Sequence, residues 1–132
     1  MIRSAAIATV LAALSTPSLA TEWINCSDAQ GEASFDFLVG TLDVIAVAGL
    51  TITVGEKVWA SDVAYGPGEP VSVGQAFEDA ETIRVDVMDE NVNARIAELR
   101  LFKATEGDAA TIYSGTLRVL GHGAWAMSCD VG

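Results

Sequence analysis

The amino-acid sequence predicts an all-β protein: a single antiparallel β-sandwich or small closed barrel of about eight strands, with its N- and C-terminal strands joined by a disulfide. Three observations lead to this prediction. Apolar and polar residues alternate through most of the chain, turn-forming residues separate the alternating runs, and one cysteine lies near each end of the expected domain. Sustained helical spacing of apolar residues is absent from the sequence.

Residues 1–20 predict a cleaved secretory signal peptide of the Sec type. Arg3 supplies the positive charge, Ala5–Leu14 is a short apolar run, and Ser18–Ala20 offers the small residues that signal peptidase requires. The apolar run is about half as long as a membrane span, and no cysteine follows it in the context of a lipoprotein signal. We therefore expect one β domain at 21–132, in the periplasm of a bacterium or secreted from it.

Strands are expected where a two-residue period places apolar side chains on one face. Six segments show this period, and their expected buried faces are Ile24 and Cys26; Ala33, Phe35, Phe37 and Val39; Ile83, Val85 and Val87; Ala97, Leu99 and Leu101; Tyr113, Leu117 and Val119; and Trp125, Met127 and Cys129. One stretch, Gln75–Ala80, could instead form a helical turn anchored by Phe77.

Turns are expected where glycine, proline and Asx residues cluster between these segments. The expected turns are Gly40-Thr41, Gly49, Gly55-Glu56, Gly66–Pro70, Asp89–Asn91, Glu106–Asp108 and Gly121–Gly123. The apolar stretch 35–54 is as long as a membrane span. Its residues Asp36 and Asp43 would each cost about 2.5–3.5 kcal/mol near the centre of a membrane helix, so strands around these turns are expected and no integral membrane segment.

The two cysteines, Cys26 and Cys129, are predicted to form a structural disulfide, because an exported chain with two thiols has a single possible intramolecular pairing. The bridge would close a loop of about 100 residues. Buried free thiols of a cytosolic protein are the alternative, which the signal peptide disfavours. A redox-active pair is also disfavoured, because catalytic dithiols usually lie close together in a Cys-x-x-Cys motif.

The chain is strongly acidic, with 18 Asp and Glu residues against 7 Lys and Arg and a formal net charge of −11 at pH 7. Such a chain repels phosphate backbones and shows no basic stripe, which argues against nucleic acid as a partner. The electrostatically favourable partners are a basic protein, a basic peptide or metal ions. The alternative is that the charge serves solubility alone.

The sequence offers little material for catalysis. The single histidine, His122, lies between two glycines and indicates a surface turn, and no Gly-x-Ser-x-Gly motif accompanies it. Carboxylates cluster at Glu78–Glu81 and Asp86–Glu90, and a chain this acidic produces such clusters by chance. No catalytic residue and no cofactor is therefore predicted.

The segment Asp89–Asn93 alternates oxygen-bearing side chains in the manner of a calcium-binding loop. Ala94 and Arg100 stand where such a loop needs a glycine and a bidentate glutamate. An Asx-rich hairpin loop is the expected structure, and no metal ligand is predicted.

Three aromatic residues, Trp23, Trp59 and Tyr65, are candidates for contacting a ligand. Trp23 is expected on the opposite face of its strand from Cys26, and Trp59 and Tyr65 precede the turn at Gly66–Pro70. Exposed Trp and Tyr side chains contribute strongly to binding surfaces. Packing in the core is the alternative for each of them.

The leading functional hypothesis is a non-enzymatic periplasmic or secreted domain that binds a ligand or partner, favouring a cationic protein. The Cys26-x-x-x-x-Gly31 spacing and the size of the chain resemble those of the periplasmic inhibitors of C-type lysozyme, which are small β-barrels. This resemblance implies a cationic cell-wall hydrolase as partner. The inhibitory loop of that family has no counterpart in the sequence, so no residue role is carried over.

Two other functions are compatible with the sequence. A small hydrolase or isomerase would place inward-facing carboxylates with raised pKa values at one mouth of a barrel. An accessory subunit of an envelope assembly would expose an apolar patch. The candidates for that patch are Leu38, Met88 and Phe102, each out of phase with the buried face of its strand.

Overall fold

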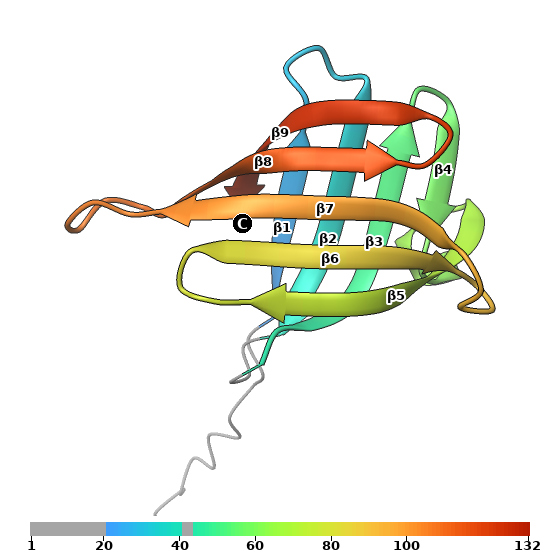
Figure 1. The fold of residues 1–132 in the computed structure, drawn as a ribbon, viewed down its shortest axis with the longest axis horizontal. Coiled ribbons are helices and arrows are strands. Elements are labelled where there is room, and N and C mark those ends of the chain that lie inside the picture. Colours follow the sequence, from blue (N-terminus) through green and yellow to red (C-terminus); the bar gives the residue numbers. More distant parts are fainter. Residues whose placement is uncertain (1–20, 41–43) are drawn as a thin grey trace, which may run out of the picture.

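A computed structural model describes residues 21–40 and 44–132. The predicted signal peptide and Thr41 of the first expected turn lie outside the described residues. The described chain forms nine strands, shown in Figure 1: β1 (Thr21–Ser27), β2 (Ala33–Gly40), β3 (Ala46–Val54), β4 (Lys57–Ala60), β5 (Glu69–Glu78), β6 (Thr82–Asp89), β7 (Arg95–Ala104), β8 (Ile112–Val119) and β9 (Gly123–Val131). A short 3-10 helix, η1 (Val63–Tyr65), lies between β4 and β5.

Each strand pairs with the next along the chain, and β9 pairs back with β1, so the sheet closes into a barrel. The pairs are antiparallel except β4 and β5, which run parallel over two residue pairs, Trp59 with Glu69 and Ala60 with Pro70. In Figure 1, β1 to β4 form one layer and β5 to β9 cross it at a steep angle. The prediction of an all-β fold is confirmed, and the architecture is the barrel, with nine strands.

The barrel interior is filled by the apolar faces of its strands, as the alternating pattern predicts. Both phenylalanines of β2, Phe35 and Phe37, are fully buried and pack edge to face with ring centroids 5.4 Å apart. The expected inward residues of β6 and β7 are buried as well, whereas Tyr113, Trp125 and Cys129 are half-buried. Among the described residues, no charged or polar side chain belongs to the buried core.

Two local predictions are wrong. Gln75–Glu78 extends strand β5 and forms no helical turn, because these residues pair with β6, and Phe77 is 52% exposed opposite Arg84. Gly49 lies inside β3 and forms no turn. The absence of a side chain at Gly49 serves a close approach, because a Cβ there would clash with the ring of Tyr65.

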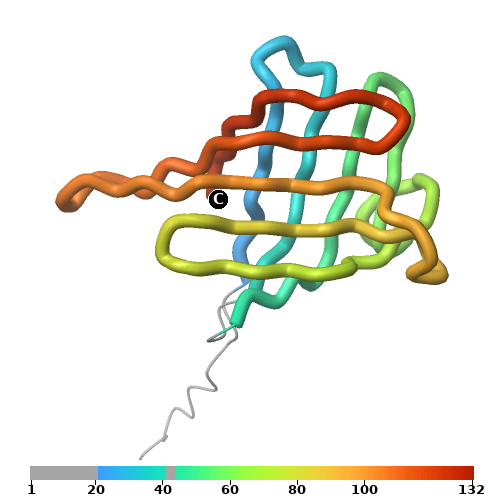
Figure 2. Tube along the Cα trace, viewed as in Figure 1, coloured from blue at the N-terminus to red at the C-terminus, as the bar shows by residue number. Residues whose placement is uncertain are grey.

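Several of the other expected turns join strands as predicted. Gly55-Glu56 connects β3 to β4, and His122 is exposed in the turn between β8 and β9. In the β6–β7 hairpin, the carboxylate of Asp89 accepts a hydrogen bond of 2.7 Å from the backbone N–H of Asn93, which confirms the Asx-rich hairpin. Figure 2 shows that the β7–β8 hairpin, which contains the expected turn at Glu106–Asp108, projects beyond the barrel.

The predicted disulfide joins Cys26 on β1 to Cys129 on β9. The two residues lie directly opposite each other in the register of these strands, with their Cα atoms 4.0 Å apart. The bridge therefore locks the pair of strands that closes the barrel.

Across the described ranges, no helix has the length and apolar character of a membrane span.

Candidate functional site

The structure brings together two of the three aromatic residues that the sequence singles out. The rings of Trp23 on β1 and Tyr65 on η1 meet edge to face, with centroids 5.8 Å apart and planes at 70°. In the strand register, Trp23 lies opposite Leu38 of β2, and Leu38 lies opposite Gly49 of β3. The ring of Tyr65 covers Gly49. Trp23, Leu38 and Tyr65, all half-buried, form a surface that we call the aromatic patch.

The loop that carries Tyr65 is anchored to β3 by three hydrogen bonds. The hydroxyl of Thr51 donates to the Tyr65 carbonyl oxygen at 2.7 Å, the backbone N–H of Leu50 donates to the Ser61 hydroxyl at 2.9 Å, and the N–H of Ser61 donates back to the Leu50 carbonyl at 3.0 Å. Asp62 caps η1 by accepting a hydrogen bond of 2.9 Å from the N–H of Ala64. The backbone that carries Tyr65 is thus held in place before any ligand arrives.

A half-buried carboxylate lies beside the aromatic patch. Asp36 is two residues before Leu38 on the same outer face of β2, between Asn25 of β1 and Thr51 of β3 in the register. Burial raises the pKa of Asp36 above its ordinary value, because the charged form loses part of its hydration. No ion pair among the described residues involves this carboxylate. A cation seated against the patch would restore the lost stabilisation of its charge.

Trp59, the third aromatic candidate, belongs to the core. It is 2% exposed, and its ring meets that of His122 edge to face at 5.0 Å. The Nζ atom of Lys57 lies 5.3 Å from the centre of the same ring. Trp59 therefore packs in the core, which is the alternative to contact with a ligand.

The candidates for an exposed apolar patch do not gather in one place. Leu38 belongs to the aromatic patch on β2, whereas Met88 and Phe102 lie on the other side of the barrel. Met88 pairs with Arg95 at one end of the β6–β7 ladder, and Phe102 pairs with Thr82 at the other.

The mouth of the barrel holds the residues most relevant to the enzymatic alternative. A hollow of about 190 Å³ is lined there by residues of five strands, among them Glu22, Glu78 and Tyr113. Glu78 pairs with Lys103 at 3.1 Å. The described part of the chain contains no group of three or more His, Cys, Asp or Glu residues placed to hold a metal ion. Catalysis at this mouth stays an alternative hypothesis.

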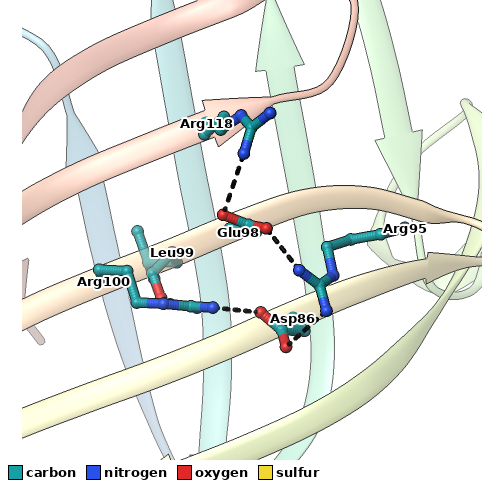
Figure 3. Close-up of polar contacts among 6 residues, drawn as sticks. All are labelled: Asp86, Arg95, Glu98, Leu99, Arg100 and Arg118. Atoms are coloured by element: carbon teal, nitrogen blue, oxygen red, sulfur yellow. Dashed lines mark hydrogen bonds and ion pairs between the residues drawn. The ribbon is translucent and has the colours of Figure 1, made fainter.

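A ladder of charged side chains crosses the outer face of β6, β7 and β8, as Figure 3 shows. Arg118 approaches Glu98 at 3.7 Å, and Glu98 pairs with Arg95 at 2.6 Å. Asp86 links Arg95, at 3.9 Å, to Arg100, at 2.8 Å. This face carries two carboxylates, Asp86 and Glu98, and four arginines, which are Arg84, Arg95, Arg100 and Arg118. It is therefore positively charged, although the formal net charge of the chain is −11.

Sequence reasoning missed Asp36 and the charge ladder as parts of candidate sites. The alternation within each strand shows which of its side chains point outward. Which outward side chains of neighbouring strands lie side by side depends on the strand register. The signal available in advance was the concentration of arginines at outward positions of two neighbouring strands, Arg84 and Arg100 among them.

No protein-family model, curated protein or solved structure matches this chain.

Proposed function

We propose that this protein is an exported, non-enzymatic binding domain that recognises a cationic protein or peptide through the aromatic patch and Asp36. One observation carries the proposal: a preformed Trp23–Tyr65 pair lies beside a carboxylate that burial has partly withdrawn from water. The lysine or arginine side chain of a partner would seat its charge near Asp36 and its methylene groups against the rings.

The chemistry of such a contact is favourable on both counts. The methylene groups that pack against the rings leave water, which is worth about 0.8 kcal/mol for each buried CH₂ group. A carboxylate at a half-buried position attracts the cation more strongly than a fully hydrated one does, because less water screens the pair. The backbone at Tyr65 is already fixed by its hydrogen bond to Thr51 of β3, so little backbone entropy is lost when the partner binds.

The charge of the whole chain would assist the encounter. A net charge of −11 attracts a basic protein over distances comparable to the Debye length and so raises the association rate at low salt. The aromatic patch would then determine how long the complex lasts. Salt is therefore expected to slow association more than it speeds dissociation.

A basic C-type lysozyme is the first probe for this proposal. Its affinity for the purified protein is measured by calorimetry at low and moderate salt, alongside hydrolysis of cell-wall substrate by the same enzyme. We expect binding that Asp36→Asn weakens by about tenfold, in line with the loss of one charge-assisted contact. The matched control is Glu106→Gln, which removes the same charge from the distant β7–β8 hairpin.

Equal affinities of the Asp36→Asn and Glu106→Gln variants would refute the role of the patch and leave only general charge attraction. Absence of binding at low salt, together with unchanged hydrolysis, would dismiss this class of partner.

Export to the periplasm or the medium is part of the same proposal. The sequence of residues 1–20 predicts the signal, and a disulfide is typical of proteins that leave the cytosol. N-terminal sequencing of the protein from its native host should begin at Thr21. Material that begins at Met1 would contradict the proposal of a cleaved signal.

A further inference from the structure

A second surface, on the side of the barrel away from the aromatic patch, centres on two arginines. Arg84 of β6 and Arg100 of β7 lie directly opposite each other in the strand register. Both occupy the outward positions of their strands, because their sequence neighbours Ile83, Val85 and Leu99 are buried. In the circle of nine strands, β6 lies four places from β2, which puts the two surfaces on opposite sides.

The two guanidinium groups differ in how they are held. Arg100 donates to Asp86 at 2.8 Å and to the carbonyl of Leu99 at 2.9 Å, so its orientation is fixed. Arg84 takes part in no ion pair or side-chain hydrogen bond among the described residues, and it is exposed. Like charges directly opposite each other on neighbouring strands are destabilising. Asp86 already offsets the charge of Arg100, so an anion held beside Arg84 would supply the counter-charge that Arg84 lacks among the described residues.

The arginine pair separates two hollows on this face. One, of about 330 Å³, is lined by Gln75 and Phe77 together with Asp86 and both arginines. The other, of about 400 Å³, is lined by Phe102 and the Thr82 end of β6, again with both arginines. The rings are available for contact, since Phe77 is 52% and Phe102 68% exposed.

We propose that Arg84 and Arg100 form a binding site for a small organic oxyanion, a carboxylate or a phosphate ester, whose apolar body packs against Phe77 or Phe102. The planar fork of Arg84 can hold either group with two parallel hydrogen bonds. The volume of each hollow lies within the range of small-molecule sites, about 300–1,000 Å³. A polyanion is disfavoured, because the chain as a whole is strongly negative.

This site is independent of the proposed recognition of a cationic partner. The two surfaces share no residue, and they demand ligands of opposite charge. Failure of one proposal therefore leaves the other standing.

Backbone amide NMR with three probes tests the site: benzoate, phenyl phosphate and uncharged phenol. We expect the two anions to cause saturable amide shifts confined to β5, β6 and β7. Phenol should bind at least about tenfold more weakly, because it lacks the charge-assisted hydrogen bonds. Comparing benzoate with phenyl phosphate shows which oxyanion is preferred. Inorganic phosphate, added separately, shows what the ring contributes.

Arg84→Gln removes the arginine without a described partner and should weaken anion binding by about tenfold or more. The matched control is Arg118→Gln, a substitution of the same kind on the same outer face but outside both hollows. Because both side chains are exposed, both variants should fold, and their amide spectra verify this directly.

Any of the following results would overturn the proposal: no saturable shifts with either anion, phenol binding as tightly as benzoate, or equal losses in the two variants. Shifts scattered over the whole barrel would also overturn it, because they would indicate unspecific attraction.

Discussion

Reduction of the Cys26–Cys129 bridge should remove a large share of the stability of this protein. The bridged residues are 103 positions apart, so the bridge closes nearly the whole of the described chain into one loop. In the chain-entropy model, a loop of this length contributes about 4.7 kcal/mol by restricting the unfolded chain. Domains of this size have total stabilities of about 5–15 kcal/mol. The reduced protein should therefore unfold at much lower denaturant concentration, with a midpoint temperature lower by roughly 20 °C.

Urea unfolding of the oxidised and reduced protein measures this loss without changing any side chain. The double variant Cys26→Ala/Cys129→Ala serves as the control, because reductant should not alter its unfolding curve. It should also be somewhat less stable than the reduced wild type, since Cys26 is buried and its sulfur fills space in the core. A difference below about 1 kcal/mol between oxidised and reduced protein would refute the entropic reasoning.

Three further substitutions test the geometry. Gly115→Ala should prevent folding or cost about 3 kcal/mol or more, seen by circular dichroism, because the new Cβ would clash with the backbone carbonyl of Arg100. Val92→Asn should raise the free energy of unfolding by about 1 kcal/mol, seen as a higher urea midpoint, because Val92 has a positive φ of 59° that asparagine tolerates better. For Asp36→Asn, the raised pKa means that the charged carboxylate disfavours the folded state at neutral pH. The variant should therefore be the more stable at pH 7, and this gain should vanish below the ordinary pKa of 3.8, which paired urea curves at pH 7 and pH 3 measure.

The buried faces could be predicted because a strand's two-residue period is a local property. Phe35 and Phe37 on β2 and Leu99 on β7 alternate with outward-facing residues in the sequence, and all three lie in the core. The error at Gln75–Ala80 arises because pairing with another strand outweighs the local preference of this segment. Gln, Ala and Glu have good helix propensity, yet pairing with β6 gives this segment a ladder of hydrogen bonds that a single helical turn cannot match.

The candidate sites were predictable only in part. Trp23 was expected on the face opposite Cys26, and the structure confirms that Cys26 is buried while Trp23 reaches the outer surface. Its contact with Tyr65 requires the β1–β2–β3 register and the absence of a side chain at Gly49. Neither can be derived from one strand alone. The four-residue strand that carries Trp59 is too short for its alternation to show which side chain points inward.

The filled interior determines where this barrel can act. Barrels of about eight strands have interiors just wide enough for side chains, or for one small ligand where the side chains are small. Here Phe35, Phe37, Leu50 and Trp59 occupy that space, and the buried core of the described residues offers no polar group to orient a ligand. Binding is thereby directed to the mouth and the outer faces. On those faces a half-buried carboxylate, Asp36, lies on β2 beside aromatic rings, and the arginines Arg84 and Arg100 lie opposite each other on β6 and β7. Solubility alone does not require this arrangement, because evenly mixed charges on the outer faces would keep the protein soluble equally well. We therefore propose that these two surfaces of the cross-linked barrel serve the recognition of ligands of opposite charge rather than solubility alone.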